Sequence, residues 1–306
     1  MRMTTRLIAF AATIALAAGA HAHRQWLLPS ATTLSGTQSW VTFDVAASND
    51  VFFADHAPGR LEGIKVWKPD GTEGDIQNGA SGRYRSVFDV KIDQPGTWKI
   101  GTVQSGIMGR FKVDGAEWRL GGRRGPPPGA AGAGGPGGPG GPGGPGGAEG
   151  AGPAGRPAPR FVNSVDEIPA NATDVELTEM SAQNVVFVTT DAPTTTVFQP
   201  TGKGLEMVPV THPDALVLGE KAQFRFLVDG QPVADLPITI VPGGKRYRES
   251  EQAMEVRTDA NGVATIDWPV AGMTWLNATL TDNKPANPRA TSRRMSYTAT
   301  LEVMAP

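Results

Sequence analysis

The chain has 306 residues, with 28 Lys and Arg against 30 Asp and Glu and no cysteine. The lack of cysteine excludes disulfides, thiol nucleophiles and zinc–thiolate sites. Without the first 22 residues, which carry two arginines, 26 basic residues face 30 acidic ones, and this net charge of −4 disfavours nucleic acid as a partner. The remaining length is enough for two compact domains.

Residues 1–22 have the layout of a secretory signal peptide. Two arginines precede an apolar run from Leu7 to Ala18, and this run is too short to span a membrane. Small residues stand at the −3 and −1 positions of two cleavage sites, one after Ala20 and one after Ala22. Because no second apolar run of spanning length follows, we expect cleavage to release a soluble protein into the periplasm.

Either cleavage leaves a histidine at the mature amino terminus. A start at His23 places an α-amine and an imidazole where they can chelate one metal ion together, as in a histidine brace. A start at His21 gives His21-Ala22-His23, in which the amine, two deprotonated amides and the third-position imidazole can enclose Cu(II) or Ni(II) in a square plane. Both arrangements need a free amine and neutral imidazoles, so binding is expected to fail in mild acid. The alternative is that histidine follows the cleavage site by chance.

Short β-rich runs follow between Trp26 and Val113. They occupy 40–45, 63–67, 84–90 and 97–103, and turn signals such as Pro69-Asp70-Gly71 separate them. Aromatic and β-branched residues alternate with polar ones, as half-buried antiparallel strands require. The pattern predicts a β-sandwich.

Residues 121–159 differ from their surroundings because they are almost entirely glycine, proline and alanine. This composition predicts a disordered segment. Strand patterning resumes at 174–177 and 184–190. The Gly/Pro-rich segment is therefore predicted to be an insert within an N-terminal β-sandwich domain of residues 23–203.

A second domain is predicted over residues 204–306. Its β-rich runs are 205–210, 221–228, 236–241, 255–258, 262–266, 272–280 and 294–303. Asp229-Gly230 and Asp259-Ala260-Asn261-Gly262 supply hairpin turns. About a hundred residues with short strands of this kind favour an immunoglobulin-like sandwich. The sequence thus predicts an all-β protein of two immunoglobulin-like β-sandwich domains with a disordered Gly/Pro-rich insert.

Only four histidines exist, His21, His23, His56 and His212, so any imidazole site must draw on them. His56 follows Asp55 in a predicted loop, where a carboxylate can orient a metal-binding ring. It is the preferred third ligand beside the mature amine and His23, and a solvated turn is its alternative role. His212 precedes Pro213 and is a lesser candidate ligand, with a structural hydrogen-bonding role as the alternative.

Basic residues gather in the second half at Lys245, Arg246, Arg248, Arg293 and Arg294. They can accept a carboxylate or an acidic protein face, although pairing within the domain is the simpler account. The sequence lacks a G-x-S-x-G elbow, a P-loop and an H-E-x-x-H pair. We therefore expect no enzymatic activity and no catalytic residues.

Several segments carry a resemblance to a known family. They are HRQWLLPS (23–30), NDVFFADHAPGR (49–60), GLEMVPVTHP (204–213), VPGGKRYRE (241–249), TDANGVATIDWPVAGMTWLNATL (258–280) and RRMSYTATLEV (293–303). The chain resembles the exported bacterial family called domain of unknown function 4198, which is grouped with the NikM-type component of nickel transport complexes. The resemblance implies a periplasmic accessory in transition-metal handling, with membrane transporter or outer-membrane receptor components as partners. Since no membrane span follows the signal, binding or delivery is expected rather than a pore.

The expected function is therefore transition-metal binding or delivery for an uptake system, with Ni, Cu, Co or Fe as the ion. Intrinsic affinity at an amine–imidazole site favours Cu, whereas the resemblance points to Ni. A structural or interaction β-sandwich with incidental histidines is the first alternative. A copper redox enzyme is the second, because a histidine brace can also activate oxygen.

Overall fold

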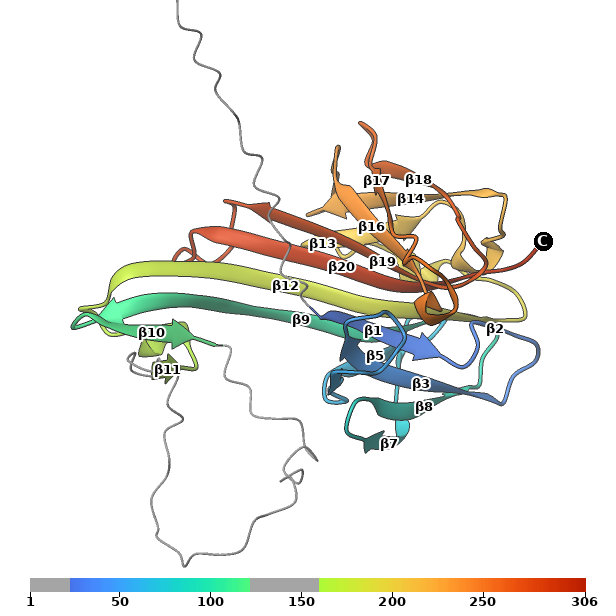
Figure 1. The fold of residues 1–306 in the computed structure, drawn as a ribbon, viewed down its shortest axis with the longest axis horizontal. Helices are drawn as coiled ribbons and strands as arrows, with labels where there is room; N and C mark the ends of the chain where they lie inside the picture. Colours follow the sequence, from blue (N-terminus) through green and yellow to red (C-terminus); the bar gives the residue numbers. More distant parts are fainter. Residues whose placement is uncertain (1–22, 122–159) are drawn as a thin grey trace, which may run out of the picture.

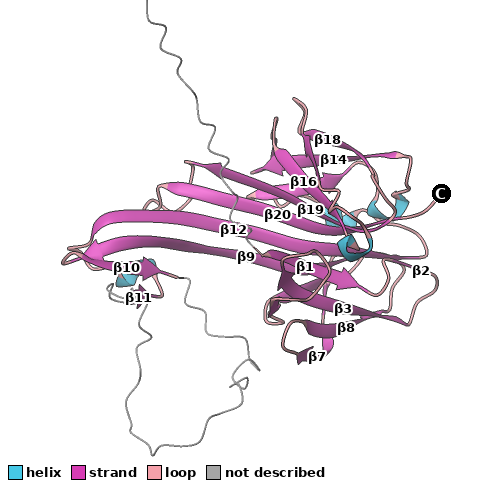
Figure 2. Cartoon of the chain, in the orientation of Figure 1, coloured by secondary structure: helices cyan, strands magenta, loops and turns pink. Residues whose placement is uncertain are grey.

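The computed structural model describes residues 23–121 and 160–306. The predicted signal peptide and nearly all of the predicted insert lie outside these residues. Over the described part the protein is all-β, as predicted, apart from short 3-10 turns: η1 (Val165–Glu167), η2 (Thr196–Phe198), η3 (Pro213–Ala215) and η4 (Lys245–Tyr247) (Figure 2). Among the described residues, no helix has the length and apolar character needed to cross a membrane.

A small antiparallel sheet, sheet A, contains the first strands. Its order is β1 (Arg24–Pro29), β3 (Ser39–Ser48), β8 (Ser86–Ile92) and β7 (Gln77–Ser81), and β4 (Ala57–Pro58) also pairs with β3. Alternate residues of β8 are buried from Ser86 to Ile92, as expected for a strand with one face on a core. The β-rich runs at 40–45 and 84–90 correspond to β3 and β8.

The central sheet, sheet B, has 11 strands and joins both halves of the chain. Its main order is β11 (Arg160–Val162), β10 (Ala116–Leu120), β9 (Gly96–Val113), β12 (Thr173–Thr190), β20 (Ser292–Val303), β19 (Gly272–Asp282), β16 (Pro237–Pro242) and β17 (Met254–Arg257). Three short strands, β2 (Thr33–Leu34), β5 (Ile64–Trp67) and β6 (Glu73–Gly74), complete it. β12 pairs in antiparallel register with β9 and in parallel register with β20.

A third sheet, sheet C, contains β13 (Leu205–Pro209), β14 (Lys221–Val228), β15 (Gln231–Pro232) and β18 (Val263–Asp267). Sheets A and C lie on either side of sheet B (Figure 1). The positions of successive β12 residues agree with this arrangement. Val186 and Val188 join the core under sheet A, whereas Val185 and Phe187 join the core under sheet C, because neighbouring strand residues point to opposite faces.

The two halves of the chain thus share one sheet rather than two separate ones. β12 lies before residue 204 and β20 after it, and they pair from Thr178↔Ser292 to Val186↔Thr300. The predicted boundary between two domains, at residues 203 and 204, stays a prediction. The physical consequence is that the two cores are stabilised together, since each uses one face of sheet B.

The strands β9 and β12 each have 18 residues and run beyond sheet A as a paired arm (Figure 1). A small core of Phe111, Leu120, Val162, Ile168, Leu177 and Ala290 lies near the end of this arm. There β10 and β11 pair in parallel, with Leu120 opposite Val162, and Gly121 N donates to Val162 O at 3.1 Å. The chain therefore leaves and re-enters the fold at neighbouring points on the two sides of residues 122–159.

Candidate metal site and the adjoining groove

His23 and His56 lie face to face. Their ring centroids are 3.4 Å apart and their planes differ by 7°. The strand register explains the meeting, because Arg24 pairs with Ser48 and Ala57 pairs with Ala47 on the two sides of β3. The residue before β1 and the residue before β4 therefore reach the same end of β3.

The stacked arrangement brings two imidazoles together without yet directing them at one ion. An imidazole binds a metal through a lone pair in its ring plane, at about 2.0 Å, and the planes of a stacked pair do not converge. Ligation therefore requires one or both rings to turn. Both His23 and His56 are exposed, so solvent leaves room for that rotation.

The loop that carries His56 is anchored from below. Trp26 Nε1 donates to Ser48 Oγ at 2.7 Å, and Ser48 Oγ donates to Asp50 O at 2.5 Å. Phe52 packs edge-on against Trp26, with centroids 5.7 Å apart, and has a φ of 61°. A bulky residue in this left-handed region is strained, so the packing around Phe52 holds the loop in a defined shape.

The acidic side chains near the pair already have partners. Asp55 accepts from Asn49 N at 3.1 Å and from Asn49 Nδ2 at 3.2 Å. Asp50 binds Lys245 at 2.6 Å, a contact that raises the pKa of Lys245, and Glu251 pairs with Arg24. Within residues 23–121 and 160–306 no group of three or more His, Asp or Glu side chains could hold a metal. The α-amine that the predicted cleavage would free at His23 is the candidate for a third nitrogen.

The contacts just described also tie the histidine pair to the second half of the chain. Lys245 and Glu251 belong to that half, and Trp275 Nε1 donates to Gln25 O at 3.0 Å. Arg24 lies over the Trp275 ring, 5.5 Å from its centroid. The start of β1 is therefore held by residues on both sides of position 204.

His212 lies elsewhere and is hydrogen-bonded through both ring nitrogens. Its Nδ1 accepts from Asp214 N at 3.1 Å and caps η3. Its Nε2 is 3.1 Å from Thr97 Oγ1 and 3.2 Å from Thr194 O. Because Nδ1 accepts, we assign the ring proton to Nε2, where it donates to the Thr194 carbonyl. These contacts match the structural alternative, and the structure does not bring His212 to His23 and His56.

A groove of about 540 Å³ adjoins His23 and was not foreseen from the sequence. Its floor is a face of sheet B on which paired residues form a row of hydroxyl and amide groups across β16, β19, β20, β12 and β9: Thr239, Asn277, Thr298, Asn184 and Thr102. His23, Arg24 and Gln25 line it from the start of β1. The groove begins where sheet A ends, because the next residues on the same face, Val186 and Ile100, are in the core.

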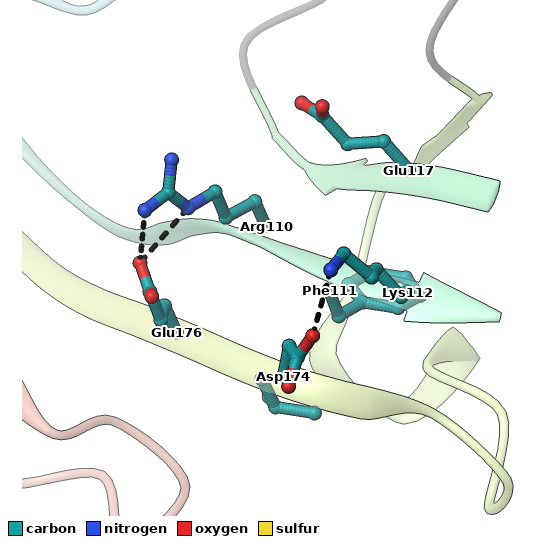
Figure 3. A pocket seen from close by; sticks show the side chains of 7 residues that line it. Arg110, Phe111, Lys112, Glu117, Asp174 and Glu176 are labelled. Atoms are coloured by element: carbon teal, nitrogen blue, oxygen red, sulfur yellow. Dashed lines mark hydrogen bonds and ion pairs between the residues drawn. The ribbon is translucent and has the colours of Figure 1, made fainter. Parts of the chain in front are cut away.

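A second hollow lies at the end of the arm and has a different character (Figure 3). Arg110 pairs with Glu176 at 2.7 Å, Lys112 with Asp174 at 2.9 Å, and Glu117 with Arg119 at 3.1 Å. These side chains are more than half exposed, and such pairs contribute little free energy. We interpret this hollow as the solvated surface of the arm.

The fold and the histidine pair define an all-β protein in which two small sheets share a long central one, with exposed imidazoles at the edge of sheet A. The chain belongs to the family described as "Domain of unknown function (DUF4198)", which it matches over residues 20–282. The resemblance to this family that the sequence indicated is confirmed, and the relation to the NikM-type component stays a prediction. Both His23 and His56 lie within the matched range.

No curated protein matches the chain. Among solved structures, the Bacillus anthracis TIE protein is similar at 10% identity and a TM-score of 0.15, over 92% of this chain and 40% of that one. The chain thus spans less than half of that protein. A likeness this weak carries no argument about fold or function.

Proposed function

We propose that the mature protein binds one divalent transition-metal ion in the periplasm and passes it to an uptake system. The ligands are the α-amine and imidazole of His23 and the imidazole of His56. The observation that carries the proposal is the 3.4 Å separation of the two rings, which are 33 positions apart in the sequence. Cleavage after Ala22 completes the ligand set by freeing the amine.

The donor set suits a borderline metal ion. Three nitrogen donors favour Cu(II) by intrinsic affinity, and Ni, Co and Fe accept the same ligands less tightly. The bound ion would supply only its own charge and coordination preferences, and the chain's part is to position the two rings. Sheet A does this through the β1–β3 and β3–β4 pairing, while the Trp26–Phe52 contact keeps the His56 loop in place.

Binding of CuCl₂ and of NiCl₂ to mature protein, measured by calorimetry at neutral pH, tests the proposal. His56→Ala, or one extra residue before His23, should each weaken affinity at least tenfold, which is about 1.4 kcal/mol. Mass spectrometry of the exported protein must also show His23 as the first residue. The variant His212→Gln is the matched control and should bind like wild type. Unchanged affinity in both the His56 and the extended variants would remove the site.

An interaction protein is the second candidate function, and a surface patch next to the His56 loop favours it. Arg246 lies over the rings of Phe53 and Tyr247, at 4.5 and 5.9 Å from their centroids. Tyr247 is 83% exposed and Phe53 is 42% exposed, and aromatic and arginine side chains of this kind are enriched at protein interfaces. A delivery protein needs such a surface too. Metal titration separates the two functions, because a purely interacting protein binds no ion.

A copper redox enzyme would share the same ligands. Oxygen consumption by copper-loaded protein with a reductant tests it directly. We expect none above free copper.

A further inference from the structure

The groove beside His23 contains a polar group that the fold leaves without a partner. Asn184 is only 9% exposed, and its Oδ1 accepts no hydrogen bond from any described residue. Its neighbour in the same row is different, because Asn277 Nδ2 donates to Thr298 Oγ1 at 2.9 Å. A buried acceptor without a donor costs about 1–3 kcal/mol. A group of this kind needs an explanation, and a ligand with N–H or O–H donors supplies one for an atom that lines a groove.

The groove also presents one unpaired cation. Arg294 lines it and is exposed, and its side chain makes no hydrogen bond or ion pair within the described part of the chain. The adjacent Arg293 contrasts with it, because Arg293 binds Asp229 at 2.8 Å and Asp282 at 2.7 Å. A guanidinium without a side-chain partner is suited to a carboxylate, which it can bind through two parallel hydrogen bonds.

The other residues that line the groove indicate which kinds of ligand it can bind. The floor continues with hydroxyl and amide side chains at Thr279, Ser296 and Gln104. Trp275 is the tryptophan in the lining, but it is only 7% exposed and lies under Arg24, so it offers no face on which a sugar ring could stack. The volume of about 540 Å³ is in the range of small-molecule sites.

We propose that this groove binds a small organic carboxylate of the amino- or hydroxycarboxylate class, which are themselves metal chelators. Arg294 holds a carboxylate, Asn184 Oδ1 accepts from an amine or hydroxyl group, and the Thr and Ser hydroxyls bind the rest. His23 lines the same groove, so the ion at His23 and His56 arrives or leaves as a complex with this carboxylate. The metal part of the proposal rests on the proposed function, whereas the carboxylate site stands on the groove alone.

The test uses calorimetric titration of metal-free mature protein with citrate, a hydroxycarboxylate, and with L-histidine, an aminocarboxylate. We expect at least one of them to bind. Arg294→Gln should weaken that binding at least tenfold, and Asn184→Val should do the same while keeping the wild-type circular dichroism spectrum. Arg225→Gln is the matched control, because Arg225 is an exposed arginine of sheet C, away from the groove, and should bind like wild type.

The outcomes separate this site from the metal site. Binding of neither probe, or equal loss in the Arg294 and Arg225 variants, overturns the carboxylate site. Carboxylate binding by a protein that binds neither CuCl₂ nor NiCl₂ supports the groove and overturns the proposed metal function. If both bind, the affinity for Ni(II) or Cu(II) should rise in the presence of the bound probe, and this rise should disappear in Arg294→Gln. A rise that persists in Arg294→Gln reflects chelation in solution and overturns the link between the two sites.

Discussion

His56 and His212 each stand close before a proline, yet they lie in opposite environments. His56 is exposed, stacks on His23, and belongs to a loop held by packing beneath it. His212 contacts Asp214 N, Thr97 Oγ1 and Thr194 O through its ring and packs edge-on against Phe198 at 5.3 Å. A histidine whose nitrogens both have partners stabilises the fold, whereas one with accessible nitrogens is available to a ligand. We therefore expect substitution of His212 to lower the stability of the protein and substitution of His56 to weaken its metal binding.

The largest effect on stability is expected at His212. His212→Ala removes the hydrogen bonds to Asp214, Thr97 and Thr194 and the contact with Phe198, and should lower the free energy of unfolding by about 2–3 kcal/mol. Urea denaturation measures this change. Affinity for NiCl₂ should stay as in wild type, so a loss of metal affinity in a folded His212 variant would contradict the comparison.

The next effect is expected at His56 and depends on metal. His56→Ala should change the unfolding free energy of metal-free protein by less than about 0.5 kcal/mol, because the ring is exposed. At a metal concentration of a hundred times the wild-type Kd, wild type should gain about 2.7 kcal/mol and a variant with tenfold weaker binding about 1.4 kcal/mol. The measurement is urea denaturation with and without NiCl₂. Equal gains in the two proteins would show that the ion binds elsewhere.

Much of the fold could be predicted from local patterns, and the exceptions have a common cause. The predicted run 236–241 corresponds to β16 (Pro237–Pro242), where the buried Ile238 and Ile240 alternate with the partly buried Pro237 and Thr239. In contrast, 97–103 and 184–190 were predicted as short strands, whereas β9 and β12 each continue for 18 residues. The missing parts, such as Gln104 to Gly106 and Ser181 to Gln183, are polar or small. Alternation marks a buried face, and these residues lie where the sheet face is open to solvent.

The candidate sites follow the same logic. The sequence placed His56 near His23 only by assigning both to one domain, and the β3 register that joins them is a property of the folded sheet. The groove could not be predicted, because its floor is a row of residues from β16, β19, β20, β12 and β9 that become neighbours only through pairing. The sequence indicated that Arg294 can bind a carboxylate. Whether its side chain is already paired depends on which acidic residues the fold brings near it.

The smallest predicted effect sharpens the comparison within that row, between Asn184 and Asn277. Asn277→Val removes a donor from Thr298 Oγ1, 2.9 Å away, and should destabilise the protein by about 1 kcal/mol. Asn184→Val removes an acceptor that has no partner among the described residues and adds a β-branched side chain to a strand interior, which favours the extended backbone. It should therefore raise the unfolding free energy, by about 0.5–1 kcal/mol. Paired urea denaturation curves of the two variants measure the difference in sign.

If Asn184→Val destabilises the protein as much as Asn277→Val does, then the fold itself satisfies Asn184 and the stability argument for a ligand in the groove fails. If Asn184→Val stabilises the protein and abolishes carboxylate binding, then Asn184 lowers the stability of the free protein and its function is to bind the ligand.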